Sequence, residues 1–60
     1  MKLWDYWFSN INDGEEFFIE CSDEDEAWEI LVSNGFDKAD YEIVQVLTPE
    51  EADEIGLDTY

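Results

Sequence analysis

The amino-acid sequence predicts a single α+β domain over residues 1–60: a small three-stranded antiparallel sheet with one main helix, in the order ββαβ, plus a short C-terminal helix. Two aromatic-rich segments near the N-terminus flank a turn-forming segment, a helical pattern follows them, and a third apolar segment precedes a proline-containing helix start. Strands followed by a segregated helix are typical of α+β domains rather than of wound α/β folds.

Residues 2–9 and 15–21 are predicted to form the two strands of an antiparallel hairpin. Both segments are rich in aromatic residues, which favour strands. Residues 10–14 (Asn-Ile-Asn-Asp-Gly) have the composition of a turn, and Asp13-Gly14 suits a backbone with positive φ.

The main helix is predicted to begin at Ser22 and to end at Gly35. The serine hydroxyl can cap the first helical turn, and an acid three residues later, Asp25, resembles the second half of a capping box. Glycine commonly follows the last residue of a helix. The i, i+3, i+4, i+7 spacing of a buried stripe is followed by Ala27, Ile30, Leu31 and Asn34.

A third strand is predicted over residues 41–47 and a second helix directly after it. Thr48-Pro49-Glu50-Glu51 combines a capping residue, a proline at the first helical position and a glutamate three residues after the cap. Gly56 can end this helix, and Leu57 can then pack back on Ala52.

Side-chain alternation along the strands predicts that both faces of the sheet carry large apolar residues. In the third strand, strict alternation places Tyr41, Ile43 and Leu47 on one face. Val44 and Val46 then lie on the other. The main helix covers one face only. The second sheet face can then be covered by the C-terminal segment, by a second copy in a homodimer, or by a partner protein.

The charge of the chain is far from that of an ordinary domain. Eighteen acidic residues stand against two lysines, which gives a formal net charge of −16 on 60 residues. Like charges held close together repel and destabilise a compact state, and they raise one another's pKa. We therefore expect stability to rise as the pH falls from neutral. A hydrophobic content of 45% with three Trp, three Tyr and four Phe nevertheless favours a folded domain over disorder.

Acidic residues gather on the predicted outer face of the main helix. A helical wheel places Asp25, Glu26 and Glu29 opposite the buried stripe, with Trp28 at the flank. Solvated helix faces usually mix acids with lysines, but no Lys or Arg lies between Leu3 and Asp37. No structural need accounts for this row, which makes it a candidate partner-binding surface.

A second acidic segment follows Pro49, and the helix dipole offers an equally good explanation for its acids. The candidate partner-binding residues of the two segments are Asp23, Glu24, Asp25, Glu26, Trp28, Glu29, Glu50, Glu51, Asp53 and Glu54.

The composition disfavours catalysis and cofactor binding. Without histidine and with one cysteine, zinc sites and imidazole chemistry are not available, and no glycine-rich phosphate loop is present. Cys21 cannot form an internal disulfide, so we expect a small buried side chain in a reducing compartment. We expect no enzyme activity, no metal and no cofactor.

The sequence also disfavours membranes and direct nucleic-acid binding. It has neither a signal-peptide pattern nor an apolar run of about 18–20 residues, and its acids would repel anionic lipid and phosphate backbones. A cytoplasmic protein is expected.

In size, acidity and aromatic content the chain resembles small acidic inhibitors of phages and mobile elements. The segment Ser22-Asp-Glu-Asp-Glu-Ala-Trp-Glu29 is the clearest part of this resemblance. The group includes anti-CRISPR inhibitors of Cas nucleases, anti-restriction proteins and uracil-DNA glycosylase inhibitors, which share no single fold. The resemblance implies a non-catalytic nucleic-acid mimic that occupies the basic groove of a nuclease or glycosylase in the host cytoplasm, with an anti-CRISPR protein as the first expectation.

Two other interpretations of the residues stay open. One is a small protein–protein interaction module that uses the aromatic sheet face around Trp7 and Phe18, with the acids serving solubility. The other is adaptation to a salt-rich cytoplasm, in which case the charge implies no site.

Overall fold

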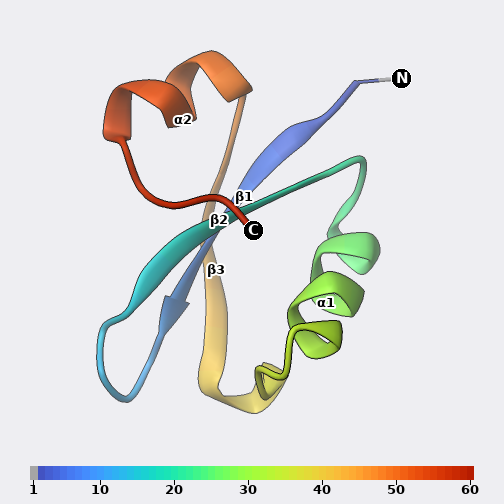
Figure 1. The fold of residues 1–60 in the computed structure, drawn as a ribbon, viewed down its shortest axis with the longest axis vertical. Helices are drawn as coiled ribbons and strands as arrows, with labels where there is room; N and C mark the ends of the chain where they lie inside the picture. Colours follow the sequence, from blue (N-terminus) through green and yellow to red (C-terminus); the bar gives the residue numbers. More distant parts are fainter. Residues whose placement is uncertain (1) are drawn as a thin grey trace.

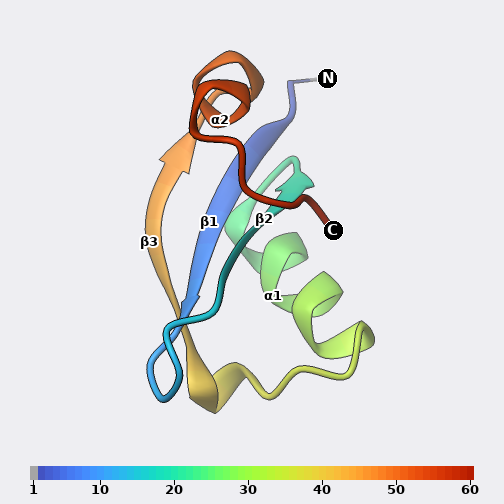
Figure 2. The ribbon, with the colours of Figure 1, turned by 60° about the vertical axis from the view of Figure 1, so that its left-hand side comes forward.

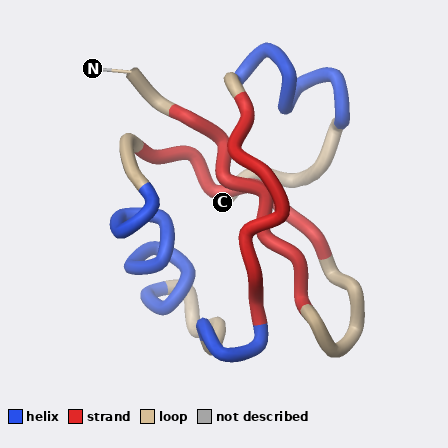
Figure 3. Tube along the Cα trace, turned by 180° about the vertical axis from the view of Figure 1, so that it is seen from behind, coloured by secondary structure: helices blue, strands red, loops and turns tan. Residues whose placement is uncertain are grey.

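The computed structural model describes residues 2–60 and confirms the predicted α+β fold. The three strands form one antiparallel sheet in the order β2-β1-β3, with β1 in the centre (Figure 1). Seen from behind, the strands run together between α1 on one side and α2 on the other (Figure 3). The elements follow in the order β1 (Trp4–Asn10), β2 (Glu16–Cys21), α1 (Glu24–Ser33), the 3-10 helix η1 (Lys38–Asp40), β3 (Tyr41–Leu47) and α2 (Pro49–Ile55).

Side chains of the β1–β2 turn hold it in place, and the turn predicted at residues 10–14 is confirmed. Asn10 Oδ1 accepts hydrogen bonds from the backbone N–H groups of Asn12 (2.8 Å) and Asp13 (3.1 Å). Gly14 has φ +78°, in the left-handed region that favours glycine. The strand β1 differs slightly from the prediction because it begins at Trp4 and extends through Asn10.

The N-terminus of α1 lies one residue later than predicted, because Asp23 and not Ser22 is the N-cap. Asp23 is extended (φ −152°), and its Oδ1 accepts a hydrogen bond from the Glu26 N–H at 2.8 Å. The Ser22 hydroxyl donates instead to the Glu26 carboxylate, also at 2.8 Å. The predicted capping box between Ser22 and Asp25 is therefore wrong.

The C-terminus of α1 ends at the predicted glycine. Gly35 has φ +89°, its N–H donates to the Val32 carbonyl at 3.0 Å, and the Phe36 N–H donates to the Leu31 carbonyl at 3.3 Å. These two bonds form a Schellman motif. The motif reverses the chain direction, so that residues 36–40 return toward the sheet below α1 (Figure 2).

The predicted start and end of α2 are confirmed. Thr48 and Glu51 form a complete capping box, with Pro49 at the beginning of the helix. Gly56 ends the helix in the left-handed conformation (φ +80°), and Leu57 packs against the cluster that contains Ala52.

A larger core fills the space between α1 and the sheet. Ala27 and Leu31 are fully buried, and Ile30 is partly buried, as the helical spacing predicts. Asn34 is exposed, contrary to the prediction, because it is the C-cap and its side-chain amide donates to the Ile30 carbonyl at 2.8 Å. The buried residues of this core are Tyr6, Phe8, Phe17, Ile19, Cys21, Ala27, Leu31 and Tyr41.

A β-bulge in β3 changes the face to which its side chains belong. Trp7 pairs with Gln45 whereas Phe8 pairs with Ile43, which leaves Val44 as an extra residue. One extra residue shifts the alternation by one position. Leu47 therefore lies on the opposite face from Ile43, and the predicted grouping of these two residues is wrong.

The second sheet face is covered by α2 and the residues after it. A smaller core joins Phe18, Leu47 and Ala52, with Trp7 and Leu57 packed against it. Of the three possible covers, the structure therefore shows the C-terminal segment, and a homodimer through this face stays a prediction.

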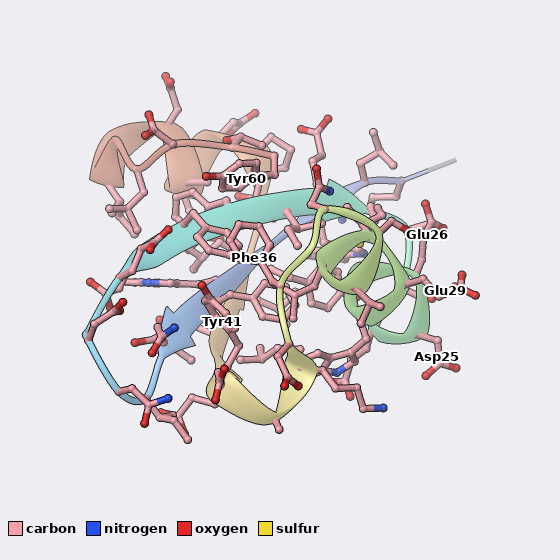
Figure 4. The ribbon with its side chains drawn as sticks, turned by 60° about the horizontal axis from the view of Figure 1, so that its bottom comes forward. Asp25, Glu26, Glu29, Phe36, Tyr41 and Tyr60 are labelled. Carbon is pink, nitrogen blue, oxygen red and sulfur yellow. The ribbon has the colours of Figure 1, made fainter. Side chains whose placement is uncertain are left out.

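The C-terminal segment also pairs with the outer edge of β2. The Phe18 N–H donates to the Asp58 carbonyl, and the Tyr60 N–H donates to the Phe18 carbonyl, both at 2.8 Å. The Tyr60 ring meets Phe17 edge-on, with ring centroids 4.6 Å apart. Figure 4 shows Tyr60 near Phe36 and Tyr41 over the sheet, and these contacts fasten the segment to the larger core.

We predict that Leu31→Ala lowers the free energy of unfolding by about 3 kcal/mol, because it removes a fully buried side chain and leaves a cavity. Val32→Ala on the same helix is the control, since Val32 is 51% exposed, and its effect should stay within about 0.5 kcal/mol. Urea unfolding followed by tryptophan fluorescence measures both. Equal effects of the two substitutions would contradict the observed helix orientation.

We predict that the Cys21 thiol of the folded protein resists thiol reagents at pH 8. Cys21 is 1% exposed, and burial raises the pKa of its thiol to about 11, with the negative charge of Glu26 adding to the effect. The reactive thiolate is therefore scarce. Absorbance of a chromogenic disulfide reagent should rise slowly for the folded chain and fast in urea. Equally fast labelling in both conditions would contradict the burial.

Candidate partner-binding site

The outer side of α1 presents two exposed carboxylates beside a partly buried indole. Asp25 and Glu29 are four residues apart and lie on one helix face, with Trp28 next to them. Figure 4 shows Asp25, Glu26 and Glu29 on the side of α1 that points away from the sheet. This arrangement agrees with the wheel drawn from the sequence.

These side chains line a hollow of about 700 Å³, named here the α1 pocket. The Trp28 ring is held edge-on against Phe8, with centroids 4.9 Å apart and an angle of 82° between the rings. A fixed aromatic surface beside carboxylates suits a cationic side chain, which can pair with the acids and stack on the ring. The lining residues are Asp25, Trp28, Glu29, Ile30, Val32, Ser33 and Lys38.

A lysine adjoins this acidic surface, which the sequence did not reveal. The chain reversal after Gly35 brings η1 back to α1, and Lys38 becomes part of the α1 pocket. Lys38 therefore lies beside a face for which the sequence supplies no cation between Leu3 and Asp37. Two carboxylates and one ammonium group leave a net negative charge in the pocket.

The remaining acids of the first segment serve the start of the helix. Asp23 is the N-cap, and Glu26 accepts the hydrogen bond from Ser22, so Glu26 has a structural role that the sequence interpretation did not give it. Glu24 is exposed in the first turn, where the helix dipole favours an acid. Of the six candidates in this segment, the structure brings Asp25, Trp28 and Glu29 together in the pocket.

The second acidic segment lies apart from the first. The helix α2 covers the opposite sheet face from α1 and lies near the other end of the sheet (Figures 1 and 2). Glu51 completes the capping box, whereas Glu50 and Glu54 are exposed without a structural partner in the described hydrogen bonds. The structure therefore does not join the two candidate segments into one surface.

A second pocket of about 400 Å³, named here the α2 pocket, lies between α2 and the β1–β2 part of the sheet. Its lining includes Asp5, a residue that the sequence interpretation did not select. Asp5 is 4% exposed, and its Oδ1 has no hydrogen-bond partner. An acid at an inward position of an aromatic strand was the signal that could have found it. The lining residues are Asp5, Glu20, Pro49, Ala52, Asp53, Gly56, Leu57 and Thr59.

The aromatic sheet face is largely occupied by the chain itself. Phe18 is 1% exposed, and the partly buried Trp7 packs edge-on against it with ring centroids 5.8 Å apart. An interaction module that uses this face would have to displace α2 and Leu57 to reach Phe18.

Comparison with family models, with curated proteins and with solved structures finds no match for this chain. Within residues 2–60, no three Asp, Glu or Cys side chains are grouped so that they could hold a metal ion. The helices of this described range are too short or too polar to cross a membrane.

We predict that Asp5→Asn stabilises the protein at pH 7 by about 1 kcal/mol. Burial raises the pKa of the Asp5 carboxyl above its ordinary value of 3.8, and the charge of Glu20 raises it further. A raised folded-state pKa means that Asp5 favours folding when it is protonated, and that this contribution is lost as the pH rises through the folded pKa.

The difference between Asp5→Asn and the natural chain should therefore shrink as the pH falls toward 3.8. Urea unfolding at a series of pH values measures it, with Asp53→Asn, an exposed acid of the same pocket, as the control. A constant difference across the acid range would show that ionisation of Asp5 does not cause the instability.

Proposed function

We propose that this protein is a non-catalytic, acidic nucleic-acid mimic that occupies the basic groove of a DNA- or RNA-binding enzyme such as a Cas nuclease. The observation that carries the proposal is the charge per unit length. Sixteen net negative charges along a longest dimension of 28 Å correspond to one charge per about 1.75 Å. Duplex DNA carries about one charge per 1.7 Å of its axis, and its binding proteins present matching lysines and arginines.

The exposure of the acids supports this proposal. All Asp and Glu side chains are exposed except those of Asp5, Glu26 and Asp40. Nearly the whole charge is therefore available to a partner. Carboxylates pair with arginine in the same bidentate way as phosphates do, so the basic groove of a nucleic-acid enzyme offers suitable partners.

The α1 pocket is the proposed point of closest contact. Asp25 and Glu29 supply charge-assisted hydrogen bonds, and Trp28 supplies an aromatic surface that becomes desolvated on binding. Tryptophan is enriched among the residues that dominate binding energies. The helix fixes the backbone positions of these three residues, and packing against Phe8 holds the Trp28 ring, which lowers the entropy cost of association.

Displacement of nucleic acid from candidate enzymes tests the proposal. A fluorescently labelled nucleic acid is bound to a guide-loaded Cas nuclease, to a restriction enzyme or to a uracil-DNA glycosylase, and the chain is added at low salt while the anisotropy is followed. We expect stoichiometric displacement from one of these enzymes, and weaker displacement as the salt concentration rises. If the chain displaces nucleic acid from none of the three enzymes at low salt, the proposal is refuted.

For the enzyme that responds, we predict that the double substitution Asp25→Lys and Glu29→Lys raises the dissociation constant about tenfold, mainly through slower association. The double substitution Glu50→Lys and Glu54→Lys is the matched control, because it has the same spacing and the same charge change on α2. Its effect should stay near twofold. Surface plasmon resonance separates the rates, and equal effects of both variants would show that total charge, and not the α1 pocket, determines binding.

A further inference from the structure

We propose that the α2 pocket binds one arginine side chain of a partner protein, and that Asp5 and Glu20 hold its guanidinium group. The pocket lies on the opposite side of the sheet from α1. The inference therefore does not depend on the nucleic-acid mimicry proposed for the α1 side.

The first argument is the unsatisfied carboxylate in the lining of the pocket. Asp5 is 4% exposed, and its Oδ1 has no hydrogen-bond partner among residues 2–60. A buried carboxylate without donors or a countercharge is unfavourable. Buried carboxylates in proteins are therefore usually paired with a donor or a cation. Asp5 lines the pocket. Its Oδ1 is closed to solvent, so a donor that enters the pocket meets the Asp5 carboxylate at its other oxygen.

The second argument is the position of a second carboxylate opposite the first. Asp5 and Glu20 are directly paired across the antiparallel strands β1 and β2. Like charges in such pairs destabilise a sheet, because their Cβ atoms lie only about 5 Å apart. A group that carries several donors and a positive charge would turn this repulsion into two favourable contacts.

The cations of the chain do not supply that group in the described structure. The Lys2 ammonium lies over the Trp4 ring at 4.4 Å from its centroid, and Lys38 lines the α1 pocket. The sequence contains no arginine. The acid pair is therefore left for a cation from outside residues 2–60.

The shape and lining of the pocket favour arginine over a metal ion or a lysine. A guanidinium has five N–H donors in a rigid plane, which allows it to bridge two carboxylates. Pro49, Ala52 and Leu57 offer apolar surface for the methylene groups of the side chain. A volume of about 400 Å³ is far larger than an ion requires. We assign the arginine to a protein because a net charge of −16 attracts basic protein surfaces.

An NMR titration with N-acetyl-arginine amide tests the proposal at constant ionic strength. We expect saturable shifts of the amide signals of Gly56, Leu57 and Thr59, with a dissociation constant of about 1 mM. N-acetyl-citrulline amide has nearly the same shape without the charge. Its dissociation constant should be at least about tenfold higher. Equal shifts with both compounds would overturn the proposal, and so would saturable shifts with calcium chloride but not with the arginine compound.

Two variants assign the binding to the carboxylates. Asp5→Asn should weaken arginine binding about tenfold, and Glu20→Gln, at an exposed position, should weaken it severalfold. Glu16→Gln is the matched control, because Glu16 lies on the same strand and the same face outside the pocket. If Asp5→Asn disturbs the fold, the arginine affinities of the Glu20→Gln and Glu16→Gln variants still show whether the pocket carboxylates bind arginine. Unchanged binding by the Glu20→Gln variant would refute the assignment, whatever the outcome of the displacement experiment on the α1 side.

Discussion

Burial of three consecutive residues in β2 is the constraint on which the rest of the structure depends. Phe17, Phe18 and Ile19 are each no more than 1% exposed, although neighbouring residues in a strand point to opposite sides of the sheet. A short chain must therefore cover both sheet faces. The helix α1 covers Phe17 and Ile19, whereas α2 and the segment after it cover Phe18. This requirement explains why the C-terminal segment passes around the edge of β2 and packs Tyr60 against Phe17.

Most of the fold could be predicted from the sequence because local signals determine it. The Thr48–Glu51 capping box and the left-handed glycine after α1 depend only on neighbouring residues, and both are as predicted. The bulge at Val44 could not be predicted, because it is a property of how β3 pairs with β1. The choice of Asp23 over Ser22 as the N-cap has a similar origin, since the Ser22 hydroxyl is engaged by the side chain of Glu26. Both serine and aspartate are good N-cap residues, so the local geometry and not the residue type determines which of the two caps α1.

In the candidate sites too, the residues placed by local periodicity could be predicted, and those placed by tertiary packing could not. Helical periodicity sufficed to place Asp25, Trp28 and Glu29 on one surface of α1. The approach of Lys38 to that surface depends on the chain reversal after α1, which a helical wheel does not contain. The burial of Asp5 depends on the packing of α2 over β1 and β2. A chain dominated by acids thus has one acid whose environment differs from all the others, and composition alone gives no means of recognising it.

The position of β3 at the edge of the sheet has a consequence for solubility. Within the described residues β3 pairs only with β1, and Val44 and Val46 are 50% and 42% exposed along it. An exposed apolar edge strand is a template for self-association, and bulges and charges are the usual protections. Here the bulge is combined with electrostatic repulsion between copies, which disappears as the pH approaches the isoelectric point near 4.1. We therefore expect colloidal stability at neutral pH and precipitation through this edge in mild acid.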